Sequence, residues 1–455
     1  MTGAESTGQL VPGDREERET RVSYDKAMQA SIRAVHELAA EETWPARGQV
    51  RWEAVASGAT LTEARERGWL VSAPAPGPAV GSSGHGPLDG LGVAVKDIID
   101  VAGLPTRNGT QGGRWREPDR SATAWQRLAD VGAHCLGKSA THEMAWGVTT
   151  PQIPNPLDPA RVAGGSSGGS AACVAAGVSP GALGTDTGGS IRIPAALCGV
   201  VGIRPTLGSV PMDGITPMAP SQDAVGPIAR DLATCTAMLE VLLQRPLALD
   251  PGVAPQLRVG ALATPGRVDA ATATAYEESV RRLGDGGVEV VRFETDLVHR
   301  AGSVSTLTML LESAAEHGEA VRDDPAAFGG EARALLTLGS GLGDQREALV
   351  RARRVLRSRT RELFARLRID AVLTPTTACV APQRESGTVA LGDREVPVAA
   401  ALSRFTAWAS ATGLPAISVP VPTPGLPVGM QLMAREHDEA LCLLLAGVVS
   451  PAPSP

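Results

Sequence analysis

Residues 161–206, a stretch rich in glycine, serine and small apolar residues, constrain the fold of this chain more than any other segment. The stretch holds two glycine clusters, and serines lie inside both of them. Glycine permits positive φ angles and a close approach of the backbone to another group, which a Cβ atom resists. Between the clusters, residues 170–178 (SAACVAAGV) predict a small-faced, buried helix. The pattern therefore predicts a catalytic loop region in which two serine-bearing turns meet.

Lysine is rare in this chain, which draws attention to each one present. Only three of the 42 basic residues are lysines, namely Lys26, Lys96 and Lys138. Arginine serves surface and salt-bridge roles but does not lose its proton near neutral pH, whereas lysine can. Lys96 lies in the apolar, strand-like run 91–101 (LGVAVKDIIDV). It is therefore either a buried amine, whose pKa burial would lower, or a strand-end side chain that reaches water.

The glycine-serine stretch resembles the signature of the amidase signature family, serine hydrolases of carboxamides. The similarity rests on GGSSGGSAA, followed by GTDTGGSIRIPAALCGVVG, and the GVAVKD segment around Lys96 is similar to the family's lysine-bearing strand. Ala163 and Arg204 depart from the usual proline and lysine of the pattern. The resemblance runs with gaps from about residue 91 to 447. It implies an α/β fold with one large domain, in which helices cover both faces of a mixed β-sheet core.

The resemblance also implies roles for individual residues. Ser190 would be the nucleophile, Ser166 a bridging serine that follows a cis peptide bond, and Lys96 the terminal base of a Ser-Ser-Lys triad. The oxyanion hole would use backbone N–H groups of the loop that ends in the nucleophile. Its expected members are Thr187, Gly188, Gly189 and Ser190. By its position Met144 matches a family residue beside the scissile carbonyl and Trp146 lies nearby, so both are either substrate-binding residues, together with Ser166, or ordinary core residues.

Other interpretations of the serines remain open from the residues alone. The segment 165–169 also satisfies the G-x-S-x-G pattern of α/β-hydrolases, with Ser167 as nucleophile. That mechanism needs a later histidine, and the candidates are His299, His317 and His437. A flexible linker would not continue into an apolar helix, and a phosphate-binding loop would need a G-K-[ST] ending that is missing here.

The implied activity is hydrolysis of a small carboxamide through a serine acyl-enzyme, without a cofactor. Within the family the alternatives are a glutamine-hydrolysing subunit of a tRNA-dependent amidotransferase and an acyl transferase that forms amides. A catalytically silent binding module is the alternative from another class, and the intact Lys96, Ser166 and Ser190 argue against it.

Charge and composition limit the classes of molecule that the chain is expected to bind. The net charge of −7 argues against nucleic-acid and anionic-membrane binding, and no apolar run reaches the roughly 18 residues that span a bilayer. The N-terminus lacks the features of a signal peptide, so we expect a cytoplasmic protein. Six cysteines without metal-like spacing predict neither a disulfide nor a metal site. We expect a polar, disordered tail over residues 1–20, an amidase domain over residues 21–450, and a possible homodimer.

Several local expectations can be compared with the structure. Residues 125–136 fit an amphipathic helix, and residues 137–139 (GKS) a turn after it. Asp186 and Arg192 flank the expected oxyanion loop and predict a structural charge pair. Further expected strands cover residues 257–263, 288–293, 370–375, 413–420 and 426–435, and residues 304–368 are expected to be mainly helical.

Overall fold

The computed structural model describes residues 58–74, 86–110, 112, 115–247, 251–263 and 266–450. The expected tail over residues 1–20 lies outside these ranges. The larger compact unit begins at Trp52 and holds all the described residues. Among them, no helix combines the length and apolar character needed to cross a bilayer.

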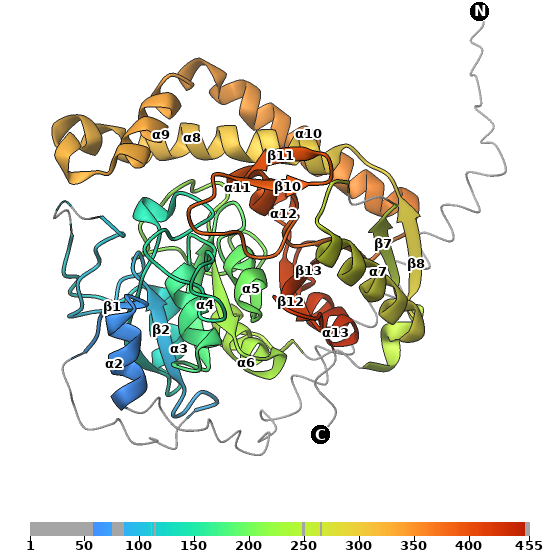
Figure 1. Cartoon of the computed structure of the whole chain (residues 1–455), viewed down its shortest axis with the longest axis horizontal. Helices are drawn as coiled ribbons and strands as arrows, with labels where there is room; N and C mark the ends of the chain where they lie inside the picture. Colours follow the sequence, from blue (N-terminus) through green and yellow to red (C-terminus); the bar gives the residue numbers. More distant parts are fainter. Residues whose placement is uncertain are drawn as a thin grey trace, which may run out of the picture. The chain divides into compact units, whose positions relative to one another are not determined.

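A mixed sheet forms the centre of the domain, with helices around it (Figure 1). The sheet has eleven strands in the order β1-β3-β2-β4-β6-β5-β12-β13-β9-β7-β8. In chain order its strands are β1 (Leu70–Ser72), β2 (Gly92–Lys96), β3 (His134–Ser139), β4 (Gly181–Asp186), β5 (Val201–Arg204), β6 (Ala224–Ala229), β7 (Arg258–Leu262), β8 (Glu289–Phe293), β9 (Ala371–Pro375), β12 (Ala416–Val421) and β13 (Val428–Ala434). A separate hairpin pairs β10 (Thr388–Leu391) with β11 (Arg394–Pro397).

Parallel pairs lie on either side of an antiparallel middle, and the edge strand β1 pairs antiparallel with β3. Strand β2 runs parallel to both β3 and β4, and β7 runs parallel to β8 and β9. From β4 to β9 every neighbouring pair is antiparallel. The carboxyl ends of parallel strands meet at one edge, so the ends of β2, β3 and β4 come together.

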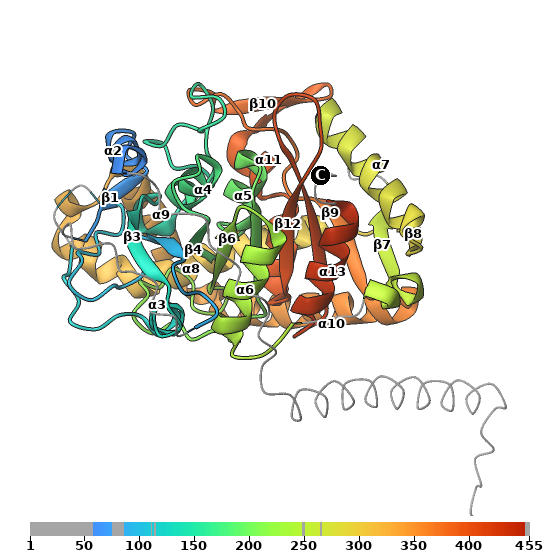
Figure 2. The ribbon, with the colours of Figure 1, turned by 90° about the horizontal axis from the view of Figure 1, so that it is seen from below.

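Helices flank this sheet. Their bounds are α2 (Gly58–Glu66), α3 (Thr123–Ala129), α4 (Gly168–Ala175), α5 (Arg192–Cys198), α6 (Leu232–Leu243), α7 (Ala270–Asp285), α8 (Leu297–Asp323), α9 (Gly330–Ser340), α10 (Arg346–Leu367), α11 (Val398–Ser403), α12 (Thr406–Thr412) and α13 (Glu439–Val449), with short 3-10 turns at Glu143–Ala145, Pro251–Gln256, Pro325–Ala327 and Gly343–Gln345. In Figure 2, α6 and α13 lie in front of the strands and α8 and α10 lie behind them. The predicted α/β architecture is therefore confirmed.

Buried apolar side chains fill the space on both sides of the sheet. Strands β2, β4, β6, β9 and β13 are buried along their whole length. A strand that is covered on both faces has a nearly continuous apolar sequence, and the segment around Lys96 has such a sequence. The buried position of Lys96 thus follows from the place of β2 inside the sheet.

One local expectation was wrong. The helix expected over residues 125–136 ends at Ala129, and His134 to Ser139 form strand β3. Gly132 has φ of +101°, a conformation through which a right-handed helix cannot continue. The expected turn at residues 137–139 is consequently part of a strand. The helix expected at residues 170–178 begins two residues earlier, as α4, and the later strands agree with their predicted ranges to within about three residues.

Candidate active site

Lys96 is the last residue of β2, and its side chain is wholly buried. Its Nζ donates hydrogen bonds to Ser166 Oγ and to Thr185 Oγ1, both at 2.7 Å. Thr185 lies near the end of the parallel neighbour β4, which explains how residues 89 positions apart meet. The structure therefore joins two of the three expected triad members directly.

Burial determines the ionisation of this amine. Desolvation lowers the pKa of Lys96 to about 7, although the carboxylates of Asp186 and Asp223 act in the opposite direction. An amine with this pKa is substantially unprotonated near neutral pH. Burial therefore favours the neutral amine that the expected base needs. The alternative of a strand-end side chain that reaches water is wrong, because the side chain is wholly buried.

The loop before α4 carries Ser166, which is also wholly buried. The peptide bond between Gly165 and Ser166 is cis, as the resemblance implies. A Cβ atom on Gly165 would lie 2.1 Å from the Thr149 carbonyl oxygen, so only glycine fits this close approach. The Ser166 carbonyl accepts a hydrogen bond from His142 N at 3.1 Å, which fixes the loop to the segment after β3.

The second serine-bearing turn connects β4 to α5. Gly189 has φ of +132°, and its carbonyl accepts the Ile193 N–H at 2.7 Å, so the turn leads directly into the helix. Ser190 is 8% exposed, and its carbonyl accepts the Ser167 N–H at 3.3 Å. This bond ties the two serine-bearing turns together, as predicted. Ser190 Oγ has no hydrogen-bond partner among the described residues.

Backbone donors of this turn point to anion binding. Within the described part of the chain, no group accepts a hydrogen bond from the N–H groups of Thr187, Gly188, Gly189 or Ser190. Buried or half-buried N–H groups normally have a partner. Unpaired amides around a serine are the arrangement that an oxyanion requires.

A buried cluster of charged side chains lies next to the turn that carries Ser190. Arg192 Nε and Nη2 donate to the two Asp186 carboxylate oxygens at 2.9 and 2.8 Å, and Arg204 Nη1 lies 3.3 Å from Asp186 Oδ1. All three side chains are fully buried. Burial alone would raise the pKa of Asp186, but the two guanidinium groups hold it well below its usual range. The predicted charge pair is confirmed, and Arg192 is unavailable to a substrate.

Sequence reasoning missed two contacts that hold this turn. Thr187 Oγ1 donates to Asp223 Oδ1 at 2.6 Å, and Thr406 Oγ1 donates to the Gly188 carbonyl at 2.7 Å. Asp223 also accepts the N–H groups of Met218 and Ala219. Asp223 lies in a segment that the family resemblance covers, whereas Thr406 lies 218 residues from Gly188 and carries no local signal.

The expected pocket residues belong to a buried apolar cluster. Met144 and Trp146 are 6% and 5% exposed and belong to the same cluster as Met218 and Leu310, against which the partly buried Met309 packs. A Cβ on Gly188 would lie 3.2 Å from the Met309 sulfur, so this cluster reaches the expected oxyanion loop. The indole N–H of Trp146 has no hydrogen-bond partner among the described residues.

The geometry disfavours Ser167 as a nucleophile, and it also disfavours the buried thiols of Cys173 and Cys198. Ser167 is wholly buried, and its Oγ donates to the Thr185 carbonyl at 3.2 Å. His317 contacts the Pro217 carbonyl and His437 contacts Ser209, so neither is a base for Ser167. Burial also raises the thiol pKa of Cys173 and Cys198 far above its usual range. His299, the third candidate, lines a cleft with Arg404 and Phe405.

Comparison with known proteins extends these observations. A family model described as "Amidase" matches residues 78–443. A 1-carboxybiuret hydrolase subunit of Pseudomonas sp. (strain ADP) is 34% identical over 384 residues, which cover 78% of this chain and 82% of the relative. A glutamyl-tRNA(Gln) amidotransferase subunit of Koribacter versatilis (strain Ellin345) is 32% identical over 421 residues, with 80% and 85% covered.

A solved structure shows that the similarity to amidases extends to the fold. A crystal structure of an amidase superposes with a TM-score of 0.77 at 32% sequence identity. The superposition covers 86% of this chain and 95% of that one. The similarity therefore extends over most of both chains.

Proposed function

The chain belongs to the amidase signature family and is an amide C–N hydrolase, and on this basis we propose that it cleaves a small carboxamide through an acyl-enzyme on Ser190. The observation that carries this proposal is the hydrogen bond of 2.7 Å between Lys96 Nζ and Ser166 Oγ. It lies in a wholly buried site where the amine pKa is about 7.

Acylation begins with proton transfer along the triad. Neutral Lys96 takes the hydroxyl proton of Ser166, and Ser166 takes that of Ser190 while Ser190 Oγ bonds to the amide carbon. Negative charge then develops on the former carbonyl oxygen. The unpaired N–H groups of residues 187–190 stabilise this oxygen, a contribution worth about 3–4 kcal/mol per donor in serine hydrolases.

Collapse of the tetrahedral intermediate breaks the C–N bond. The proton held on Lys96 returns through Ser166 to the leaving nitrogen, which departs as ammonia or an amine. A water molecule then attacks the ester on Ser190 and passes its proton along the same relay. Ser190 regains its proton, and the acyl group leaves as a carboxylate. Met144 and Trp146 are proposed to contact the substrate through the apolar cluster near Gly188.

A second function is favoured by one observation, the 32% identity to a glutamyl-tRNA(Gln) amidotransferase subunit. In that case the chain would hydrolyse glutamine and deliver ammonia to a partner protein. The same triad would serve both reactions.

Fluorophosphonate labelling combined with ammonia detection tests the proposal. We expect covalent labelling of Ser190 and ammonia release from a panel of primary amides by the isolated chain. Glutamine as the only accepted amide, together with copurification of a second protein, would favour the amidotransferase function. Absence of both labelling and hydrolysis in the folded chain would overturn the serine mechanism.

A further inference from the structure

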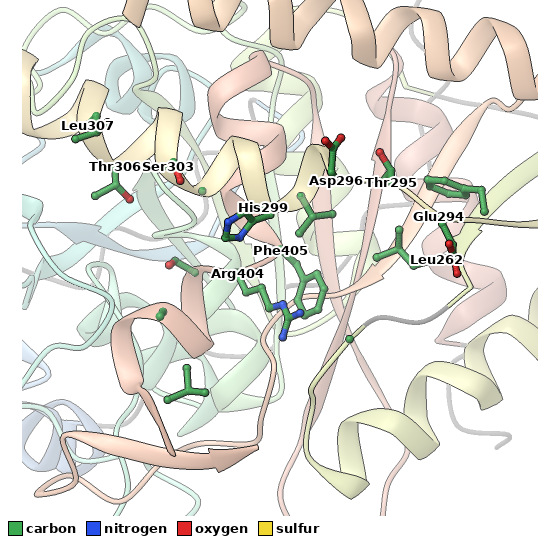
Figure 3. Close-up of a pocket in the computed structure, with 17 residues that line it drawn as sticks. Leu262, Glu294, Thr295, Asp296, His299, Ser303, Thr306, Leu307, Arg404 and Phe405 are labelled. Carbon is green, nitrogen blue, oxygen red and sulfur yellow. The ribbon is translucent and has the colours of Figure 1, made fainter. Parts of the chain in front are cut away.

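The structure contains a cleft of about 1170 Å³ whose lining does not include Lys96, Ser166 or Ser190. One wall is α8, and the opposite wall is the segment from β11 through α11 to Phe405. Figure 3 shows Thr306 and Leu307 on α8, and Arg404 and Phe405 on the segment that precedes α12. The volume is sufficient for a small organic substrate.

Two contacts connect this cleft to the Ser190 turn. Thr406 Oγ1 donates both to the Gly188 carbonyl, at 2.7 Å, and to the carbonyl of Ser403, which lines the cleft, at 3.2 Å. On α8, Thr306 lines the cleft and Met309 lies one helical turn further on, on the same side of the helix. Met309 lies close enough to Gly188 that a Cβ there would be 3.2 Å from its sulfur, so residues of both walls adjoin the expected oxyanion loop.

Arg404 supplies a positive charge without a counter-ion. Its Nη1 donates to the Arg267 carbonyl at 2.7 Å, and its guanidinium lies 5.4 Å from the centre of the Phe405 ring. No carboxylate among the described residues forms an ion pair with Arg404. Burial and the like charge of Arg267 lower the pKa of Arg404. A half-buried arginine in this setting gains from an added anion.

The two acidic residues that line the cleft do not act as counter-ions of Arg404. Asp296 pairs with Arg300 one turn along α8, at 2.5 Å. Glu294 is exposed, and in Figure 3 it lies with Asp296 on the side of the β8–α8 connection, away from Arg404. The guanidinium of Arg404 therefore keeps free N–H donors for a ligand.

We propose that the substrate is an amide whose far end carries a carboxylate, and that Arg404 binds this carboxylate while the reacting carbonyl lies at Ser190. This inference rests on the proposed amidase function. Arg404 then determines specificity and takes no part in proton transfer. Its planar guanidinium suits a carboxylate because two parallel hydrogen bonds can form.

The test compares two amides of equal chain length, a monoamide of a dicarboxylic acid and the corresponding neutral amide. For the wild type we expect kcat/KM to favour the charged amide by about tenfold or more, as for a charge-assisted contact worth about 1.4 kcal/mol. In Arg404→Gln this ratio should fall toward one, mainly through KM. Arg404→Lys should restore part of it, because lysine keeps the charge without the paired donors.

Arg300→Gln is the matched control, since it removes an arginine beside the cleft that already has a partner. It should preserve the wild-type ratio. A second measurement needs no variant: a dicarboxylate should slow fluorophosphonate labelling of the wild type more than a monocarboxylate does at equal ionic strength.

The outcomes separate the two proposals. If the wild type is labelled and hydrolyses both amides equally well, the carboxylate inference is wrong and the amidase function stands. A ratio that survives in Arg404→Gln would also overturn the inference. If neither amide is hydrolysed and Ser190 is not labelled, the proposed function itself fails.

Discussion

Lys138 Nζ lies 3.2 Å from Asp97 Oδ1, and both side chains are buried. Lys138 comes from β3 and Asp97 directly follows β2, so the pair joins two parallel strands at their carboxyl ends. The carboxylate next to Lys96 therefore already has a cation. Among the described residues, Lys96 Nζ donates to two hydroxyl groups and to no carboxylate, which separates its role from that of a counter-ion.

Replacing Lys96 with arginine tests this distinction. Arginine keeps the charge and much of the length but cannot accept a proton at working pH. We expect Lys96→Arg to lose roughly a thousandfold in acylation rate, within the 10²–10⁴ range of general-base losses, and to be nearly as damaged as Lys96→Ala. Single-turnover kinetics with an activated amide give the rate, and thermal melts show that each variant folds.

Lys138→Arg is the matched control for that experiment. It preserves the ion pair with Asp97, so most of the turnover per folded molecule should remain. Lys138→Met should instead reduce stability, because it leaves Asp97 buried without a cation. An active, stable Lys96→Arg enzyme would remove Lys96 from the proposed mechanism.

The pH dependence of kcat/KM follows from the pKa of Lys96, which burial lowers to about 7. Below that pKa the amine is an ammonium ion and cannot act as a base. Above it the amine is neutral, so activity on an uncharged amide should rise with pH along one ionisation and then level off. A profile that is flat from about pH 5 to 9, or that falls as pH rises, would contradict a neutral lysine base.

Ser190→Ala should abolish both turnover and covalent labelling. The backbone of its turn depends on Gly189 and on the Ile193 N–H contact, so the fold should persist. Ser167→Ala is the comparison, because Ser167 hydrogen-bonds to the backbone of Thr185 and not to a base. Intact-protein mass spectrometry after fluorophosphonate treatment measures labelling. Labelling that disappears only in Ser167→Ala would favour the α/β-hydrolase interpretation.

Asp186→Asn should destabilise the fold by about 3–5 kcal/mol, because it leaves Arg192 and Arg204 buried without their carboxylate. The control is Glu347→Gln, which breaks the exposed pair with Arg351 and should change stability by less than about 1 kcal/mol. Chemical denaturation of both variants measures the difference. Equal effects would mean that the buried cluster does not hold the Ser190 turn.

Much of the site follows from local sequence. The glycines at 165 and 189 mark a close approach and a positive φ angle, and both requirements act within a few residues of the serines they serve. The apolar run around Lys96 likewise predicts a buried strand, since side chains on both faces must be covered. The family resemblance predicts Ser166 and Ser190 as site residues because their motifs are continuous in the chain.

The partners of these residues depend on tertiary structure. Lys96 meets Thr185 only because β2 and β4 are parallel neighbours, and Thr406 reaches Gly188 across 218 residues. The cleft likewise exists only because folding places residues of α8 opposite Arg404. Sequence alone determined which backbone conformations and buried strands are possible, because those are set by neighbouring residues. Only the order of strands in the folded sheet decided which side chains meet, since contacts between distant segments exist only after packing brings them together.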